Sequence, residues 1–200
     1  PFMKRLNLNF LVISFIFLVL VVRLMAAYFF SDTHLDNEWG KLVHNLELSG
    51  IFGINVVIDD FRATHKFANP GDIVLPSIFM PPLYAYFIYF IKLFLVNSFD
   101  LIKTVIFFQI VLSLVSIYLF FKVLRTFEDF NTSFLLTSVF ALFPMYIYSS
   151  TQISSATLQI FLLLFFFYFL NELINKKNLL YLIFFSIFSG LLILIRGEFI

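Results

Sequence analysis

Five long apolar segments constrain the fold of this 200-residue chain more than any other feature, and short polar breaks separate the last four. The five segments are Leu8–Phe30, Leu101–Leu124, Phe130–Ser149, Ile153–Leu170 and Leu179–Ile195. The first contains 23 residues, which extend about 34 Å as an α-helix and therefore exceed the ~30 Å hydrocarbon core of a bilayer. The pattern predicts an all-α, polytopic helical membrane protein with about five transmembrane helices.

The composition supports this prediction and excludes several other classes of protein. Hydrophobic residues make up 62% of the chain and charged residues only 12%, whereas soluble domains are about 45–50% apolar and about 25% charged. A soluble globule of this size cannot bury so much apolar surface. The composition therefore excludes a soluble enzyme, a nucleic-acid-binding domain and a disordered segment.

The distribution of lysine and arginine predicts how the spans are oriented. Pro81–Val96 has only 16 residues, about 24 Å as a helix, and it is rich in tyrosine, so we expect it to lie in the outer interface. The N-terminus and the basic loops after the second and fourth spans then lie in the cytoplasm, as the positive-inside rule requires. Residues 31–100 form the first extracytoplasmic loop, and residues 1–200 form a single membrane domain. Because Ile200 closely follows a span, we expect the chain to be the N-terminal part of a longer protein.

The first outer loop is predicted to contain two juxtamembrane helices, at about 36–49 and about 81–96. In the first helix, Trp39, Leu42, Val43 and Leu46 recur at i, i+3, i+4 and i+7, which is one apolar face of an amphipathic helix that Gly50 ends. Two acids stand at its start. Asp36 is either an N-cap or a general base, and Glu38 either complements the helix dipole or assists in catalysis.

The order of these features resembles the GT-C superfamily of integral-membrane glycosyltransferases, and within it the protein O-mannosyltransferase and aminoarabinose–lipid A transferase group. The resemblance covers the layout of essentially all 200 residues. Its motifs are Asp36-Asn37-Glu38-Trp39-Gly40-Lys41-Leu42-Val43-His44-Asn45-Leu46, then Gly50, and later Pro81-Pro82-Leu83-Tyr84. It implies transfer of a sugar, usually with inversion, from a polyprenyl-phosphate carrier to a hydroxyl of a protein, lipid A or polysaccharide on the extracytoplasmic face.

The resemblance also implies roles for particular residues. Asp36 corresponds to the catalytic acid of the family, with Glu38 as the neighbouring candidate, and Arg196 corresponds to the basic residue that meets the lipid phosphate. Tyr84, Arg62 and Lys66 complete our candidate substrate-binding set, although Arg62 and Lys66 can equally be solvated loop charges.

One feature of the chain departs from the family. Many members carry a second acid before the fourth crossing, which can help to bind a metal, whereas the stretch Thr151–Thr157 has no carboxylate here. We therefore assign no metal ligand and no cofactor; a divalent metal remains possible but the sequence does not support one. Gln152, Ser154 and Ser155 either hydrogen-bond substrate or pack between helices.

Two further intramembrane polar features leave alternatives open. Arg23 lies about 10 Å from the outer end of the first span, where it either has a function or extends its head group to the interface. Gln109, Ser113 and Ser116 form a stripe that is most simply an interhelical packing face.

The sequence therefore predicts a glycosyltransferase of the bacterial inner membrane, with a cytoplasmic N-terminus and an extracytoplasmic active site. Its partners would be a polyprenyl-phosphate sugar donor, a lipid, protein or glycan acceptor and membrane lipids, but no nucleic acid. The alternatives are a transporter or flippase for a lipid-linked sugar and an inactive scaffold homologue.

Overall fold

The computed structural model describes residues 2–35, 37–57, 62–63, 73–76, 80–95 and 101–196, and of residues 2–11, 13, 55–57 and 62–63 it describes the backbone alone. The chain divides into two compact units. We call Pro1–Ser31 with Ile106–Ser189 the bundle unit, and Asp32–Val105 with Gly190–Ile200 the loop unit.

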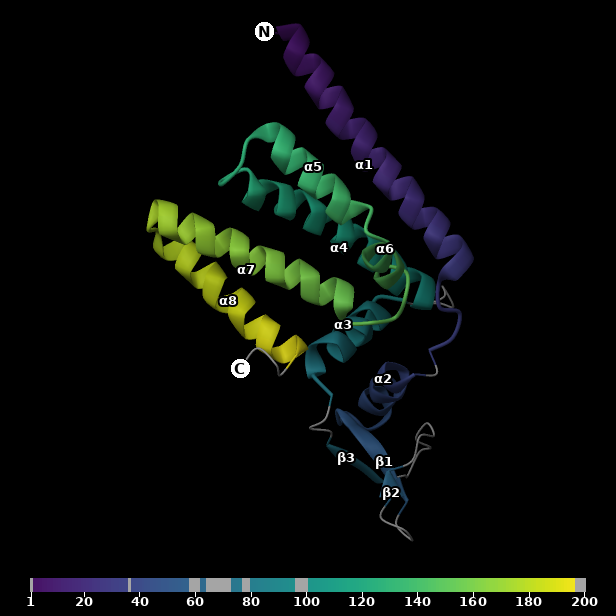
Figure 1. Cartoon of the computed structure of the whole chain (residues 1–200). Coiled ribbons are helices and arrows are strands. Elements are labelled where there is room, and N and C mark those ends of the chain that lie inside the picture. The colour runs from purple at the N-terminus through teal and green to yellow at the C-terminus, as the bar shows by residue number, and fades with distance from the viewer. Residues whose placement is uncertain are drawn as a thin grey trace. The chain divides into compact units, whose positions relative to one another are not determined.

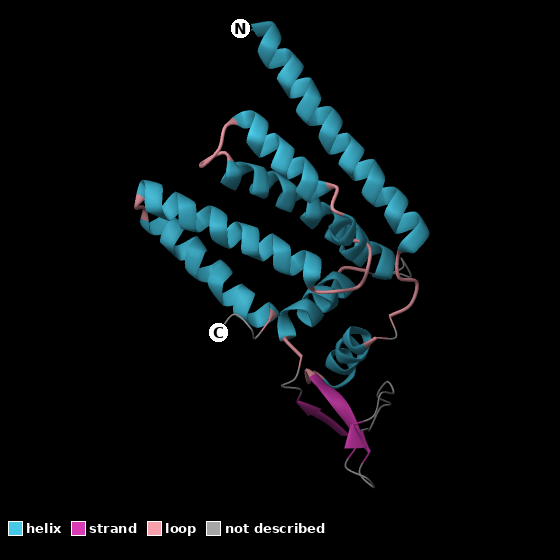
Figure 2. Ribbon diagram, in the orientation of Figure 1, coloured by secondary structure: helices cyan, strands magenta, loops and turns pink. Residues whose placement is uncertain are grey.

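Most of the described residues belong to helices, and the strands lie in one segment of the chain, between residues 53 and 76 (Figures 1 and 2). In chain order the elements are α1 (Phe2–Phe30), α2 (Glu38–Ser49), β1 (Gly53–Val57), β2 (Arg62–Ala63), β3 (Ile73–Pro76), α3 (Pro82–Leu93), α4 (Leu101–Leu124), α5 (Phe130–Ala141), α6 (Pro144–Ser149), α7 (Ala156–Lys176) and α8 (Leu179–Ile195).

The helix boundaries agree closely with the apolar segments of the sequence. Helix α4 coincides with the predicted second span, and α8 with the fifth. The predicted third span is divided at Pro144 into α5 and α6, because proline lacks the N–H that a continuous helix requires. Within the described residues, α4 and α7 are long and apolar enough to cross a membrane.

The prediction of an all-α fold is wrong for the segment between α2 and α3. Strand β1 pairs antiparallel with β2, in the register Val56 with Ala63, and with β3, in the register Gly53 with Pro76. The order of the sheet is β2-β1-β3 (Figure 2). The β-branched residues that favour strands are present in both β1 and β3, but our sequence analysis assigned only loop charges to this segment.

The bundle unit is held together largely by aliphatic and aromatic contacts. Val19, Ile117, Ala141 and Tyr146 form a buried cluster. Helices α7 and α8 form an antiparallel pair (Figure 1). Phenylalanine rings stack between them, with the ring centroids of Phe165 and Phe188 4.7 Å apart. Phenylalanines of α7 and α8 therefore contribute to the packing of this helix pair, since an aromatic pair stabilises by more than the burial of its apolar surface alone.

Candidate functional site

Helix α2 begins and ends at residues suited to those positions. Asn37 is the N-cap, and its side-chain oxygen accepts a hydrogen bond from the Gly40 amide at 3.2 Å. Of the two alternatives for Asp36, the N-cap is therefore wrong, because the next residue fills that position; Asp36 itself lies outside the described residues. Gly50 ends the helix, as predicted, with φ of 69° in the left-handed region that glycine adopts without strain.

An aromatic contact joins α2 to α3 inside the loop unit. The rings of Trp39 and Tyr84 lie edge to face, with centroids 4.9 Å apart. Tyr84, Ala85 and Ile88 are completely buried on α3, and Leu42 and Val43 are almost completely buried on α2. The predicted amphipathic face of α2 thus packs inward. The burial of Tyr84 favours a packing role for this side chain over the predicted contact with substrate.

A buried hydrogen bond joins α2 to the sheet. The Asn45 side chain donates its Nδ2–H to the carbonyl oxygen of Gly53 at 2.8 Å, and Asn45 is almost completely buried. Gly53 itself packs tightly against β3, since a Cβ atom built there would lie 2.1 Å from the Leu75 carbonyl oxygen. Helix α2 is therefore fixed on two sides, by α3 and by β1.

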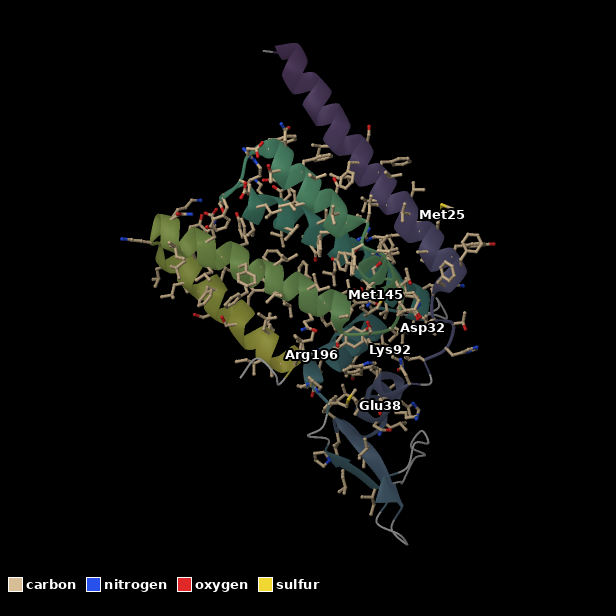
Figure 3. The ribbon with its side chains drawn as sticks, viewed as in Figure 1. Met25, Asp32, Glu38, Lys92, Met145 and Arg196 are labelled. Atoms are coloured by element: carbon tan, nitrogen blue, oxygen red, sulfur yellow. The ribbon has the colours of Figure 1, made fainter. Side chains whose placement is uncertain are left out.

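Figure 3 labels Asp32, Glu38, Lys92 and Arg196 among the described charged side chains of the loop unit. Glu38, in the first turn of α2, is exposed. Glu47 and Lys92 form an ion pair between α2 and α3 that leaves their side chains 46% and 34% exposed. Arg196 is exposed directly after the end of α8, and its amide donates to the Leu192 carbonyl oxygen at 3.1 Å.

The structure places three of the predicted site residues whose side chains are described, Glu38, Tyr84 and Arg196, in one unit. Arg196 is far from Glu38 in sequence, yet the last residues of the chain cluster with the loop unit. The candidate base Asp36 directly precedes Asn37, the N-cap of α2, but like Lys66 it lies outside the described residues. The backbone of Arg62 belongs to β2, where it pairs with Val57, and its side chain is not described.

Within the described residues, no group of three or more His, Asp or Glu side chains is arranged to hold a metal ion.

The bundle unit contains a charge whose position the sequence left open. Arg23 is completely buried, and its Nε donates to the Ser113 hydroxyl at 2.8 Å. The alternative in which Arg23 extends to the membrane interface is therefore wrong. The predicted packing stripe is also buried, and Gln109 donates its Nε2–H to the Ser154 carbonyl oxygen at 3.1 Å.

Comparison of the chain with protein-family models, with curated proteins and with solved structures found no match.

Proposed function

We propose that the chain is part of a membrane glycosyltransferase of the GT-C type, which transfers a sugar from a polyprenyl-phosphate carrier to a hydroxyl acceptor. The observation that carries the proposal is that the loop unit brings together groups from distant parts of the chain. The unit contains helix α2, whose first turn carries Glu38 and packs through Trp39 on Tyr84, together with the cation Arg196 that follows α8. A base and a phosphate-binding cation are the two groups that this reaction requires.

The reaction assigns a distinct task to each group. The bond between the sugar C1 and the phosphate oxygen breaks, and polyprenyl phosphate leaves. Because a phosphate already carries its negative charge well, its departure requires a cation more than a proton, and Arg196 supplies that cation. The acceptor hydroxyl gives its proton to the Asp36 carboxylate as its oxygen bonds to C1. Attack opposite the leaving phosphate inverts the configuration at C1.

The length of α3 supports the proposed membrane topology. Helix α3 has 12 residues and extends only about 18 Å, too short to cross a ~30 Å hydrocarbon core. If α3 does not cross, residues 31–100 and Arg196 lie on the same side of the membrane, and the basic loops around Arg125 and Lys176 lie on the other. The proposed site is then extracytoplasmic, with the N-terminus in the cytoplasm.

One observation bears on the alternative of a transporter or flippase. Transporters often bind substrate where a membrane helix is interrupted, and the break between α5 and α6 is such an interruption. Here a side chain of the protein itself occupies the break, because Arg23 of α1 donates to the Ala141 carbonyl oxygen. This occupancy favours the transferase over the transporter.

The test is a transfer assay with the full-length protein in proteoliposomes and a radiolabelled polyprenyl-phosphate sugar. Asp36→Asn should lower kcat by about 100- to 10,000-fold, the usual contribution of a general base, while the melting temperature stays unchanged. Glu38→Gln is the matched control and should lower kcat far less. Arg196→Ala should mainly raise the KM for the donor.

Two results would contradict the proposal. Near-normal transfer by Asp36→Asn would exclude this residue as the base. Donor movement across the bilayer without any transfer to a hydroxyl would favour a transporter, and neither activity would favour the inactive scaffold.

A further inference from the structure

The buried Arg23 of α1 makes its contacts entirely within the bundle unit. Besides the bond to Ser113 on α4, its Nη1–H donates to the carbonyl oxygen of Ala141 at 3.1 Å, and its guanidinium carbon lies 5.2 Å from the ring centroid of Tyr146. The ion pairs found among the described residues do not include Arg23. A fully buried cation is therefore stabilised here by neutral groups.

The carbonyl of Ala141 is available because α5 ends there. In a continuous helix, the amide of Met145 would donate to it. Instead, Leu142 and Phe143 interrupt the helix, and α6 starts at Pro144. The amides of Leu142 and Phe143 donate to Ser138 and Phe140, at 3.0 and 3.3 Å. The carbonyl of Ala141 thus receives its donor from another helix.

The position of the guanidinium also suits its charge. The C-terminal end of a helix carries a partial negative charge, and cations near it are stabilised. Ala141 is the last residue of α5, so the end of this helix is one group that balances the charge of Arg23. The face of the Tyr146 ring is a second. The Tyr146 hydroxyl in turn donates to the Ser113 carbonyl oxygen at 3.3 Å, which links α6 back to α4.

We propose that Arg23 caps the C-terminus of α5 in trans, and that Arg23 and Pro144 act as a pair to keep the α5–α6 break open. Proline prevents a continuous helix, and the arginine satisfies the carbonyl that this leaves without a backbone donor. The two residues should therefore be energetically coupled although they lie on different helices. The proposal does not depend on the transferase function.

The first test is a double-mutant cycle of melting temperatures for the full-length protein in detergent. Arg23→Met leaves the Ala141 carbonyl buried without a donor, so it should lower the melting temperature by about 4–8 °C. Adding Pro144→Ala should recover at least half of that loss, because a continuous helix brings the Met145 amide to the Ala141 carbonyl. Leu24→Met, a neighbour that is 49% exposed on α1, is the matched control and should show no coupling to Pro144→Ala.

The second test measures the break itself. The chain has no cysteine, so a spin-label pair at Val139 and Tyr148, both more than half exposed, reports on α5 and α6 alone. In Arg23→Met/Pro144→Ala the label distance should shift to that of a continuous helix, with a rise of about 13–14 Å over nine residues.

Three results would overturn the proposal. These are strictly additive changes in melting temperature, a melting temperature that Arg23→Met leaves unchanged or raises, and a label distance that the double variant leaves unchanged. If Arg23→Met alone yields no folded protein, recovery of folded protein in the double variant supports the proposal, and failure to recover it overturns the proposal.

Discussion

The two units of the molecule differ in whether a charged side chain lies in their interior. The bundle unit buries Arg23 completely, where its guanidinium donates to a hydroxyl and a carbonyl oxygen and lies beside an aromatic ring. Other charged side chains of this unit, such as Lys122, Arg125 and Lys176, are exposed. In the loop unit, Glu38, Glu47, Lys92 and Arg196 lie at or near the surface, and the fully buried side chains of α2 and α3 are apolar, aromatic or neutral.

The difference separates a buried charge that fixes helices from charges at the surface, where a substrate can reach them. A buried cation whose donors bind backbone and side-chain oxygens of its own unit fixes helices. An exposed carboxylate on a rigid helix can meet a substrate without prior rearrangement, since the helix holds it in place. The proposed catalytic chemistry therefore belongs to the loop unit, and the comparison can be tested in both units.

The largest effect is expected from Tyr84→Ala. Removal of this completely buried ring should lower the free energy of unfolding of the loop unit by about 3–5 kcal/mol, the usual cost of truncating a core aromatic side chain. Trp39, the only tryptophan of the chain, contacts Tyr84, so its fluorescence reports on this unit. Tyr86→Ala, at a neighbouring residue that is 46% exposed, is the control and should cost much less. Equal costs for the two variants would show that the loop unit has no rigid core at α3.

A smaller effect should distinguish two amide side chains that make the same kind of bond. Asn45→Ala in the loop unit leaves the Gly53 carbonyl oxygen without its side-chain donor, at a cost of about 1–3 kcal/mol. Gln109→Ala in the bundle removes the bond to Ser154 and should cost only about 0.6 kcal/mol, the average for hydrogen bonds inside membranes. Chemical unfolding of both variants measures the difference. A larger cost for Gln109→Ala would reverse the order and argue against a membrane environment around α4.

The smallest effect is expected from the ion pair of Lys92 and Glu47. Because both side chains are partly exposed, their coupling energy should be only about 0.2–1 kcal/mol and should fall in high salt. A double-mutant cycle with Lys92→Met and Glu47→Gln, at low and high ionic strength, measures it. A coupling well above 1 kcal/mol that salt does not weaken would mean that charge also holds the loop unit together.

Much of the helical fold could be predicted because apolar length and turn residues act locally. The run that ends at Leu124 has no polar break, so the bounds of α4 followed directly from it. The kink at Pro144 and the end of α2 at Gly50 each depend on one residue and its own backbone geometry.

The parts that could not be predicted depend on partners far away in the chain. Whether Arg23 points inward or outward depends on Ser113 and Ala141, which belong to helices much later in the sequence. Strand β1 requires β3 as its pairing partner, and β3 begins only at Ile73. One of the two alternatives for Asp36 placed the N-cap of α2 one residue too early, because Asp36 and Asn37 are both good capping residues and only the backbone distinguishes them.

The contacts of Arg23 have a consequence for the order in which the protein is assembled. Its hydrogen-bond partners lie 90 and 118 residues further along the chain, so they are synthesised long after α1. In the proposed topology, α1 must enter the bilayer while its cation has neither partner, at a cost of about 2.5–3.5 kcal/mol near a helix centre. The guanidinium gains these two hydrogen-bond partners only after α4 and α5 have been synthesised and packed against α1. A bundle that lacks α4 or α5 therefore keeps the Arg23 charge in the membrane without one of these partners, and this cost disfavours incompletely assembled forms.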